Sequence, residues 1–441
     1  VFGSELQGDI NADGIVDYKD SELLSDYLVG RSSGNSNYNY DINADGETDI
    51  FVVNTCTVTN QSDQKCRQAL HQIRRQHPES LIVATGCMVN HRKNELLENK
   101  TVDYAIDNER KYALFNIIDK HFKGEQVDPE GLVVDLFGYR PAFDTFHTRS
   151  LIKIHDGCNN FCSYCLIPMV RGRATSRSDK DIYDNIRQVV DHGFKEIVLT
   201  GVNMGRYQYQ DVNFENLIEN ILKIDGDFRL RISSIEPDNF SDRFLQLFEN
   251  KKLAPHMHIC LQSGAENTLK AMRRHYTASE FKTMCDRIKS AIPDFNITTD
   301  LIVGFPGETE EDFMESAQMC REIGFSHIHT FKYSIRNGTK AATMPNQIPE
   351  KIKTERSAII RSISAENKKK YLEQMMGKQQ KMLIERINSD GIAQGYGENY
   401  IPMRLRGKDL EKNTFVNVKV DSIIEKGDNS EVRVIQQDKM S

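Results

Sequence analysis

The stretch Lys153-Ile-His-Asp-Gly-Cys158-Asn-Asn-Phe-Cys162-Ser-Tyr-Cys165-Leu-Ile-Pro168 places three cysteines within eight residues, in the spacing Cys-x3-Cys-x2-Cys. Thiolates this close together in a compact loop can converge on one face of an iron–sulfur cluster. Three protein ligands leave one iron of a four-iron cluster open, and an open position is where a metal site performs chemistry. The alternatives are a zinc knuckle and three cysteines that are close together by chance. Zinc usually takes four ligands from paired Cys-x2-Cys units, and no second pair follows nearby.

This spacing, with Tyr164 directly before the last cysteine, resembles the radical S-adenosylmethionine (SAM) superfamily. In that superfamily the open iron binds the amino and carboxylate groups of SAM. An electron from the cluster then cleaves SAM to methionine and a 5′-deoxyadenosyl radical. The resemblance implies that Cys158, Cys162 and Cys165 hold a 4Fe–4S cluster, that SAM is a cofactor, and that an external electron donor is needed. The protein itself would position these groups and exclude competing reactions.

The composition is that of a soluble globular protein with several domains. A chain of 441 residues with 39% hydrophobic and 27% charged residues predicts two to four domains. No run of about eighteen apolar residues is present, so no membrane span is expected. The first residues, Val-Phe-Gly-Ser-Glu-Leu-Gln, do not read as a signal peptide. Nine cysteines, clustered by motif, favour metal binding in a reducing compartment, and we expect a cytoplasmic protein.

The net charge of −7 is distributed unevenly along the chain. Residues 1–50 hold eleven acidic and two basic residues, so the remainder carries a charge of +2. The helix-like segment 351–386 has ten basic and four acidic residues. This basic segment is available for phosphate contacts, although a solvated helix face explains it equally well.

Residues 1–49 begin with a calcium-loop pattern followed by a short helical segment, Ser21–Val29. Oxygen ligands stand at loop positions 1, 3, 5, 9 and 12, and Gly14 occupies position 6, where an EF-hand loop turns sharply. The candidate ligands are Asp9, Asn11, Asp13, Asp17 and Asp20. A second copy begins at Asp41 but has Val52 at its twelfth position. The pair is similar to a dockerin, which implies calcium and a cohesin-like partner outside the cell; the alternative is a pair of ordinary surface turns.

Residues 50–140 predict a small parallel sheet with a cysteine after each of two strands. The β-branched runs Ile50–Val53 and Leu81–Ala84 are typical of buried parallel strands, and Ser62–His77 has the spacing of a helix. Cys56 and Cys87 follow the two strands, where open α/β sheets place ligands.

The motifs Asn54-Thr-Cys56-Thr-Val-Thr and Ala84-Thr-Gly-Cys87 resemble the flavodoxin-like N-terminal domain of the methylthiotransferases, which are radical SAM enzymes. Those enzymes hold a second 4Fe–4S cluster there with three cysteines. The family's first cysteine lies in a Gly-Cys-Lys-x-Asn turn that this sequence lacks, so only Cys56 and Cys87 match. Cys66 falls on the predicted helix and is poorly placed to replace the missing ligand. The lost βα unit should also leave the small sheet with an exposed edge.

Residues 145–370 predict a partial (β/α) barrel, because strand-like and helix-like segments alternate. The predicted strands are 196–200, 229–235, 256–261, 296–303 and 327–333. The predicted helices are 182–193, 214–224, 242–249, 278–292 and 310–323. Cys260, Cys285 and Cys320 fall within these patterns and read as buried apolar residues, while His256 and His258 favour a structural role.

Polar and glycine-rich motifs follow four of the predicted strands, where a barrel places its site. They are Thr200-Gly-Val-Asn203, Ser233-Ser-Ile-Glu236-Pro, Leu261-Gln-Ser-Gly264 and Asp300-Leu-Ile-Val-Gly304. All four resemble the methylthiotransferases. The resemblance implies that SAM is flanked by Gly201, Glu236, Gln262 and Val303, with Tyr164 against its adenine. The residues of these motifs are most similar to those of the methylthiotransferase branch that modifies N6-threonylcarbamoyladenosine.

The segment 376–441 predicts a small β-barrel. Five short strand-like runs separated by Gly, Asn and Asp turns follow the basic helix 351–376. At this place in the chain the segment resembles a TRAM domain, an RNA-binding barrel. Small barrels commonly bind RNA through phosphate contacts and stacking, and Arg404, Arg406 and Lys408 are the candidate residues.

The sequence therefore predicts a radical SAM methylthiotransferase that adds a methylthio group to carbon 2 of N6-threonylcarbamoyladenosine at position 37, in the anticodon stem-loop of tRNA. A sulfur source would be needed, and no residue stands out as a general acid or base. The missing auxiliary cysteine could impair the activity. The alternatives are an isopentenyladenosine tRNA, a ribosomal-protein aspartate, or a calcium-dependent scaffold-binding fusion with an impaired enzyme.

Overall fold

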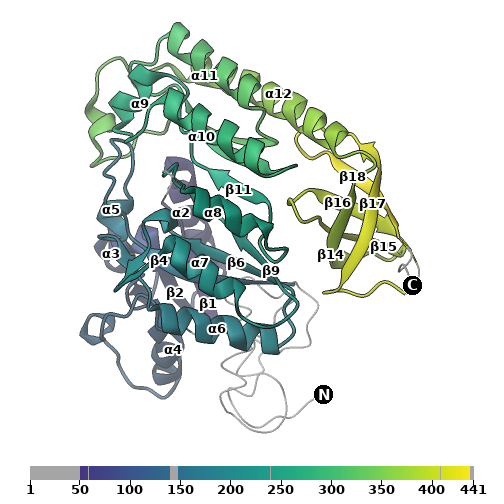
Figure 1. Ribbon diagram of the computed structural model, residues 1–441. Coiled ribbons are helices and arrows are strands. Elements are labelled where there is room, and N and C mark those ends of the chain that lie inside the picture. Colours follow the sequence, from purple (N-terminus) through teal and green to yellow (C-terminus); the bar gives the residue numbers. More distant parts are fainter. Residues whose placement is uncertain (1–49, 58, 140–147, 239, 408, 438–441) are drawn as a thin grey trace. The chain divides into compact units, whose positions relative to one another are not determined.

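The computed structural model describes residues 50–437 apart from 58, 140–147, 239 and 408 (Figure 1). The chain divides into two compact units, Val1–His147 with Leu166–Arg173, and Thr148–Cys165 with Ala174–Ser441. The second unit thus contains both the predicted partial barrel and the C-terminal domain. The five candidate calcium ligands (Asp9, Asn11, Asp13, Asp17 and Asp20) and Lys408 lie outside the described residues.

The first unit is built on a parallel sheet in the order β1 (Ile50–Thr55), β2 (Leu81–Gly86) and β3 (Tyr104–Ile106). Every residue of the central strand β2 is buried, because alternate side chains meet helices on both faces. Leu81 and Val83 pack with α4 (Leu114–Phe122), and Ile82 and Ala84 pack with α2 (Asn60–Gln76) and α3 (Cys87–Glu98). Among the described residues β1 pairs only with β2. The predicted exposed edge depends on residues before Ile50, which lie outside the described part of the chain.

The second unit contains two four-stranded sheets that the chain joins into one curved sheet. The strands are β4 (Arg149–Asp156), β6 (Glu196–Gly201), β9 (Arg229–Ile232), β10 (Ser234–Ile235), β11 (His256–Ile259), β12 (Asn296–Val303) and β13 (His327–Lys332), all parallel to their neighbours, with the antiparallel edge strand β5 (Thr175–Ser176). Residues 229–235 connect the halves: the Ser233 N–H donates to Leu199 O on one side, and the Cys260 N–H donates to Ile235 O on the other. A small hairpin, β7 (Gln208–Tyr209) and β8 (Val212–Asn213), lies outside this sheet. The predicted partial barrel is confirmed.

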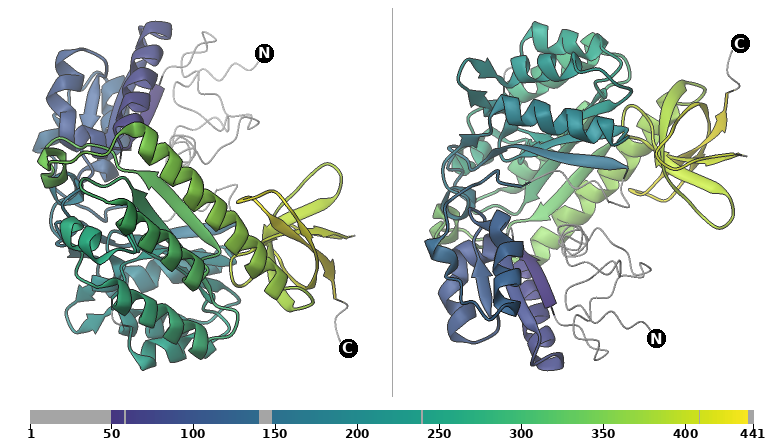
Figure 2. Two further views of the ribbon diagram at one scale, coloured as in Figure 1. Left: turned by 90° about the horizontal axis from the view of Figure 1, so that it is seen from above. Right: turned by 90° about the horizontal axis from the view of Figure 1, so that it is seen from below.

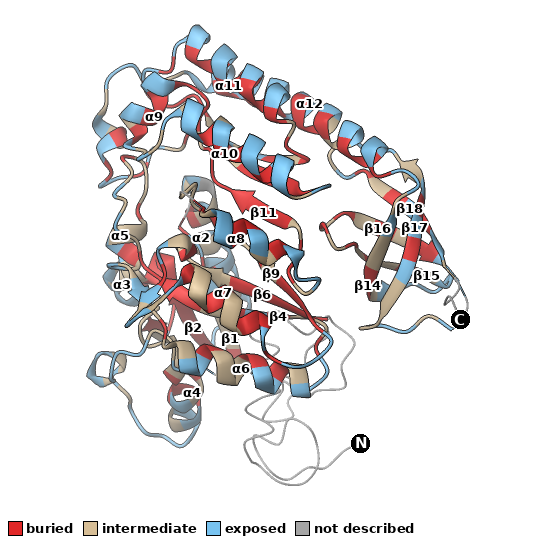
Figure 3. Cartoon of the chain, in the orientation of Figure 1, coloured by how far each residue is buried: buried red, intermediate tan, exposed pale blue. Residues whose placement is uncertain are grey.

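Helices lie along the outside of this curved sheet (Figure 1). They are α6 (Asp179–Asp191), α7 (Phe214–Leu222), α8 (Asp242–Gln246), α9 (Glu266–Met272), α10 (Ala278–Ala291), α11 (Glu310–Ile323) and α12 (Glu350–Gln374). Figure 3 shows the strands as largely buried, while the outward faces of α10, α11 and α12 are exposed. The short helix α5 (Ile167–Val170) belongs to the first unit. None of the described helices is both long and apolar enough to cross a membrane.

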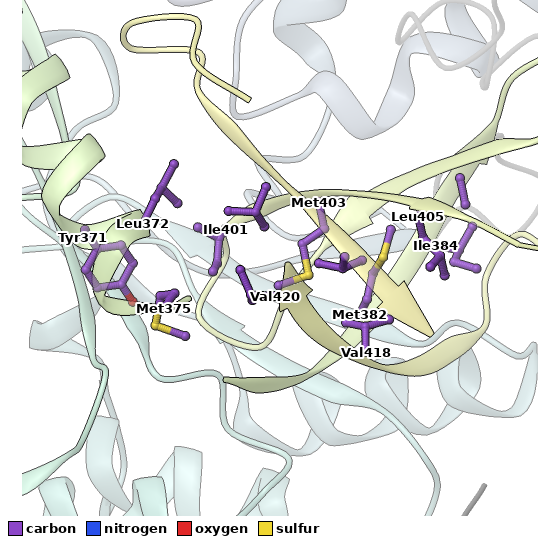
Figure 4. Close-up of a cluster of buried hydrophobic side chains, with 13 residues drawn as sticks. Tyr371, Leu372, Met375, Met382, Ile384, Ile401, Met403, Leu405, Val418 and Val420 are labelled. Atoms are coloured by element: carbon purple, nitrogen blue, oxygen red, sulfur yellow. The ribbon is translucent and has the colours of Figure 1, made fainter. Parts of the chain in front are cut away.

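Residues 379–436 form the predicted closed barrel, in the order β14 (Gln379–Ile387), β15 (Ile392–Tyr396), β16 (Pro402–Arg406), β18 (Glu431–Gln436) and β17 (Phe415–Ile424). Alternate residues of these strands, including Met382, Ile384, Met403 and Leu405, fill the interior (Figure 4). Leu372 and Met375, at the end of α12, extend the same cluster. Helix α12 therefore connects the curved sheet to the barrel, as the left view of Figure 2 shows.

The barrel is attached to the amino-terminal ends of the core strands. Arg229, the first residue of β9, donates to the backbone oxygens of Lys381, Tyr396 and Gly397. Its side chain is 5% exposed and lies 3.4 Å from the carboxylate of Glu196, the first residue of β6. Barrel carbonyls that would lose water on burial are thus satisfied by a charged donor.

Candidate functional site

The three-cysteine loop joins β4 to α5, and its middle is fixed by hydrogen bonds. The buried Ser163 donates its N–H to Met272 O (3.0 Å) and its hydroxyl to Ala271 O (2.8 Å), both at the end of α9. The oxygen of Ser163 accepts from the Ala341 N–H at 2.8 Å. Because Ser163 lies between Cys162 and Cys165, these bonds fix the loop between its second and third cysteines.

Hydrogen-bond donors point at the loop sulfurs. The Asn160 N–H lies 3.4 Å from Cys158 Sγ, and the Asn203 Nδ2 amide lies 3.7 Å from the same sulfur. Arg274 Nη1 lies 3.3 Å from Cys162 Sγ. Burial raises the pKa of Cys162, and the Arg274 cation opposes that shift. Donors of this kind stabilise thiolates, and hydrogen bonds to the sulfurs set the potential of an iron–sulfur cluster.

Arg274 is the main residue that the sequence reasoning missed. Its side chain is 3% exposed and forms an ion pair with Glu236, one of the residues predicted to flank SAM. Arg274 also donates to Cys260 O at 3.3 Å. Burying a guanidinium without a partner for its charge destabilises the fold, so removing Glu236 or Cys162 should also disturb Arg274. The sequence feature that could have pointed to Arg274 is the polar run Met272-Arg-Arg-His-Tyr276, which lies between two helical patterns.

Tyr164 packs into an apolar cluster beside the loop. Its ring meets Phe305 edge-on, with the centroids 6.4 Å apart, and Met272 and Tyr333 belong to the same cluster. Burial raises the pKa of Tyr164 well above its ordinary value, so the phenol stays neutral. The tyrosine can therefore offer an aromatic surface to a ligand.

Gly201, Gln262 and Val303 lie at or just beyond the carboxyl ends of β6, β11 and β12, as predicted. A Cβ on Gly201 would lie 2.7 Å from His155 O, so strand packing by itself already demands glycine there. Gln262 has a φ of +65° and bridges to Leu301 through backbone bonds at both ends. Val303 is buried, so only its backbone could face a ligand.

The loop and its neighbours fit a cluster that binds SAM. The donor set consists of three thiols with polar N–H groups directed at two of them. Asn203 has a φ of +55°, which turns its amide toward the loop, and within the described part of the chain its buried Oδ1 finds no hydrogen-bond donor. A buried amide oxygen of this kind is usually paired, so a bound group with an N–H would complete it.

In the first unit, Cys56 and Cys87 follow neighbouring strands whose last residues, Thr55 and Gly86, are register partners. Gly86 has a φ of +99°, and a Cβ there would lie 2.3 Å from Thr55 O, so only glycine allows this approach. Cys66 Sγ lies 3.9 Å from Cys56 O, so the helical cysteine comes nearer this site than the sequence suggested.

Cys87 is buried and begins α3, a helix that the sequence analysis did not predict. Asn108 Nδ2 lies 3.6 Å and Arg171 Nε lies 3.2 Å from its sulfur. The Cys87 sulfur therefore accepts from two N–H donors. Cys260, Cys285 and Cys320 are buried, as predicted.

Two sequence families match the chain: the radical SAM superfamily over residues 152–320, and the family described as uncharacterized protein family UPF0004 over residues 18–107. The structure of the radical SAM methyltransferase TsrM from Kitasatospora setae shares the fold, with a TM-score of 0.51 and 16% identity, covering 68% of this chain and 67% of that one. The fold and the cysteine loop thus define a radical SAM enzyme.

The threonylcarbamoyladenosine tRNA methylthiotransferase MtaB of Bacillus subtilis is 36% identical over 387 residues, which are 84% of this chain and 85% of the relative. The tRNA-2-methylthio-N(6)-dimethylallyladenosine synthase of Lachnoclostridium phytofermentans is 32% identical, covering 91% of this chain and 90% of the relative. The chain belongs to the radical SAM methylthiotransferase family. Membership implies a 4Fe–4S cluster and SAM as cofactors of a transferase.

Proposed function

We propose that this protein adds a methylthio group to carbon 2 of N6-threonylcarbamoyladenosine at position 37 of tRNA. The observation that carries the proposal is the similarity, over most of both chains, to a relative whose name specifies that substrate. In this proposal Cys158, Cys162 and Cys165 hold the cluster, which supplies the electron for SAM cleavage. Tyr164, Gly201, Gln262 and Val303 flank the cofactor, and Glu236 reaches it together with Arg274.

The chain's own groups would control charge and order around the cofactors. Arg274 places a cation next to Cys162 Sγ, which favours the thiolate needed for metal binding. The Asn203 amide donates to Cys158 Sγ and leaves its oxygen available to a bound N–H group. Tyr164 and Phe305 would place an apolar surface beside the loop.

Cys56 and Cys87 would hold an auxiliary 4Fe–4S cluster with one protein ligand fewer than the family uses. Anaerobic reconstitution followed by iron and sulfide analysis tests this point. About eight irons per chain would show that both clusters assemble, whereas about four would show that only the loop cluster does.

The C-terminal barrel would contact the RNA. Arg406 is exposed at the end of β16, whereas Arg404 is partly engaged by Glu431 at 2.7 Å, so Arg406 is the better phosphate contact. Calcium binding by residues 1–49 and a cohesin-like partner are a separate proposal, and calorimetric titration with calcium and a cohesin would test both.

The substrate assignment can be tested with purified, reconstituted protein, SAM, a reductant and a sulfide source under anaerobic conditions. One tRNA should carry N6-threonylcarbamoyladenosine, a second isopentenyladenosine, and a third neither modification. We expect a methylthio product on the first tRNA alone when digested nucleosides are analysed by mass spectrometry. Product on the second tRNA alone would assign the protein to the other branch. In a parallel reaction with ribosomal protein in place of tRNA, a methylthio product would indicate an aspartate substrate.

A further inference from the structure

The inner face of the curved sheet carries a group of polar side chains that the proposed reaction does not use. His258 and Cys260 are two residues apart at the end of β11, and Thr298 and Asp300 are two residues apart on the neighbouring strand β12. Residues spaced by two along a strand share one face. Register pairs His258 with Thr298 and Asp300 with His329, so these side chains form adjacent rows across three strands.

Three of these side chains converge on one point. His258 Nε2 lies 3.1 Å from Asp300 Oδ1, and Cys260 Sγ lies 4.0 Å from Asp300 Oδ2. One ligand atom from each of the three residues lies within 4.8 Å of the other two, and no other group of three or more His, Cys, Asp or Glu in the described residues does this. From this geometry we propose that His258, Cys260 and Asp300 bind a divalent zinc-class metal ion, separate from the iron–sulfur clusters.

A tetrahedral ion sets the distances that the three ligand atoms must reach. Bond lengths of about 2.0–2.1 Å to nitrogen, 2.1 Å to oxygen and 2.3 Å to sulfur at tetrahedral angles require the nitrogen and oxygen to be about 3.4 Å apart and the sulfur and oxygen about 3.6 Å apart. The observed nitrogen–oxygen separation of 3.1 Å is to Asp300 Oδ1, whereas the sulfur–oxygen separation of 4.0 Å is to Asp300 Oδ2. Closing the site on one carboxylate oxygen therefore requires the Asp300 carboxylate to turn and the three ligand atoms, which lie within 4.8 Å of one another, to draw together.

The surroundings hold these ligands in place. His258 Nδ1 lies 3.0 Å from Thr298 Oγ1, which orients the ring so that Nε2 points toward Asp300. Second partners of this kind commonly fix a metal-binding histidine. The Cys260 backbone oxygen accepts from Tyr276 at 3.0 Å and from Arg274 at 3.3 Å, which fixes the end of β11.

Three protein ligands of mixed N, S and O type with a fourth position open are the pattern of a zinc site that binds a further group. The Asp300 side chain is 23% exposed, so the group is not closed off from ligands. An imidazole and a thiolate select zinc over magnesium or calcium. This inference does not depend on which RNA is the substrate.

The test uses the full chain after cluster reconstitution, treated with a small excess of zinc chloride and then gel-filtered. Zinc and iron are measured by mass spectrometry on the wild type and on variants Cys260→Ala, Asp300→Asn and Cys285→Ala. Cys285 is the matched control, a buried cysteine of the same unit on α10. We expect about one zinc per chain in the wild type and in Cys285→Ala, at least a fivefold loss in the other two, and unchanged iron in all.

A cluster-ligand variant and X-ray absorption at the zinc edge test the metal site independently of the variants above. Cys158→Ala should lose iron but retain zinc, which separates failure of the metal site from failure of the cluster assignment. Zinc X-ray absorption of the wild type should show one sulfur neighbour at about 2.3 Å with nitrogen or oxygen neighbours at about 2.0 Å, independently of how the variants fold. A wild type without zinc, equal zinc in Cys260→Ala, or two or more sulfur neighbours would reduce the group to a hydrogen-bonded network only and overturn the proposal.

Discussion

Replacing Arg274 with methionine should lower the reduction potential of the loop cluster. The arginine is nearly buried, and its Nη1 lies 3.3 Å from Cys162 Sγ. Its positive charge therefore stabilises the reduced form of a cluster bound by that sulfur, which carries one more electron than the oxidised form. One charge at about 6 Å in an effective dielectric of about 20 contributes about 2.8 kcal/mol, or roughly 120 mV for a one-electron couple. We therefore expect a decrease on the order of 100 mV, measured by anaerobic redox titration with EPR detection.

Two controls separate this electrostatic effect from a structural one. Glu236→Gln removes the opposing charge and should raise the potential, and the double variant should fall between the single ones because the two charges oppose each other. Arg243→Met removes an exposed arginine that pairs with Glu219, so its potential should equal that of the wild type. If Arg274→Met titrates within about 20 mV of the wild type, Arg274 does not act on the cluster.

Four other outcomes follow from the described contacts. If Cys87 holds the proposed auxiliary cluster, Cys87→Ala should lower only the iron of that cluster and leave SAM cleavage intact, because Cys87 and the loop cysteines belong to different units; loss of cleavage would contradict this. Gly86→Ala should destabilise the first unit by about 2–3 kcal/mol in thermal unfolding, whereas Gly124→Ala, with a φ of +75° but open space around it, should cost about 1 kcal/mol. Burial lowers the pKa of His327 to about 4, so the unfolded chain binds the proton at a higher pH than the folded chain does. The free energy of unfolding, measured by urea titration at each pH, should therefore fall by about 2 kcal/mol from pH 6.5 to 4. The variant His327→Gln should show a smaller fall over the same pH range. Arg229→Met should expose the linker 375–378 to limited proteolysis by leaving three barrel carbonyls without their donor, and equal cleavage of Arg243→Met would show that the effect is unspecific.

The helices and strands in which apolar residues recur regularly could be predicted from the sequence, and most predicted bounds agree with the structure. The helix expected at 310–323 is α11, and the strand at 296–303 is β12. The run 229–235 was expected as one strand, but Ser233 separates β9 from β10. The break at Ser233 lies where the chain passes from one four-stranded sheet to the other. No residue pattern within 229–235 indicates where the strand ends.

The site could be predicted only where its residues belong to a motif. The sequence predicted that the cysteine loop follows a strand and that Gly201, Gln262 and Val303 lie at strand ends, because spacing and position in a parallel sheet restrict where ligands lie. Arg274 was missed because its role depends on Cys162 and Glu236, which are distant in sequence. The group of His258, Cys260 and Asp300 was missed for a similar reason, since each residue alone reads as part of a buried strand.

The two ends of the curved sheet have separate tasks. The loop, Arg274 and the proposed metal ligands gather toward the carboxyl ends, whereas Arg149, Glu196 and Arg229 stand first in their strands and hold the small barrel. Arg149 lies over the rings of Tyr396 and Tyr400, which end β15 and precede β16. In the β15–β16 hairpin, Tyr396 pairs with Pro402 and Ile392 with Arg406, so Arg406 lies four residues, or about 13 Å, from the attached end. If Arg406 contacts the RNA as proposed, that RNA must pass the attached end of the barrel and run along the core strands to reach their carboxyl ends.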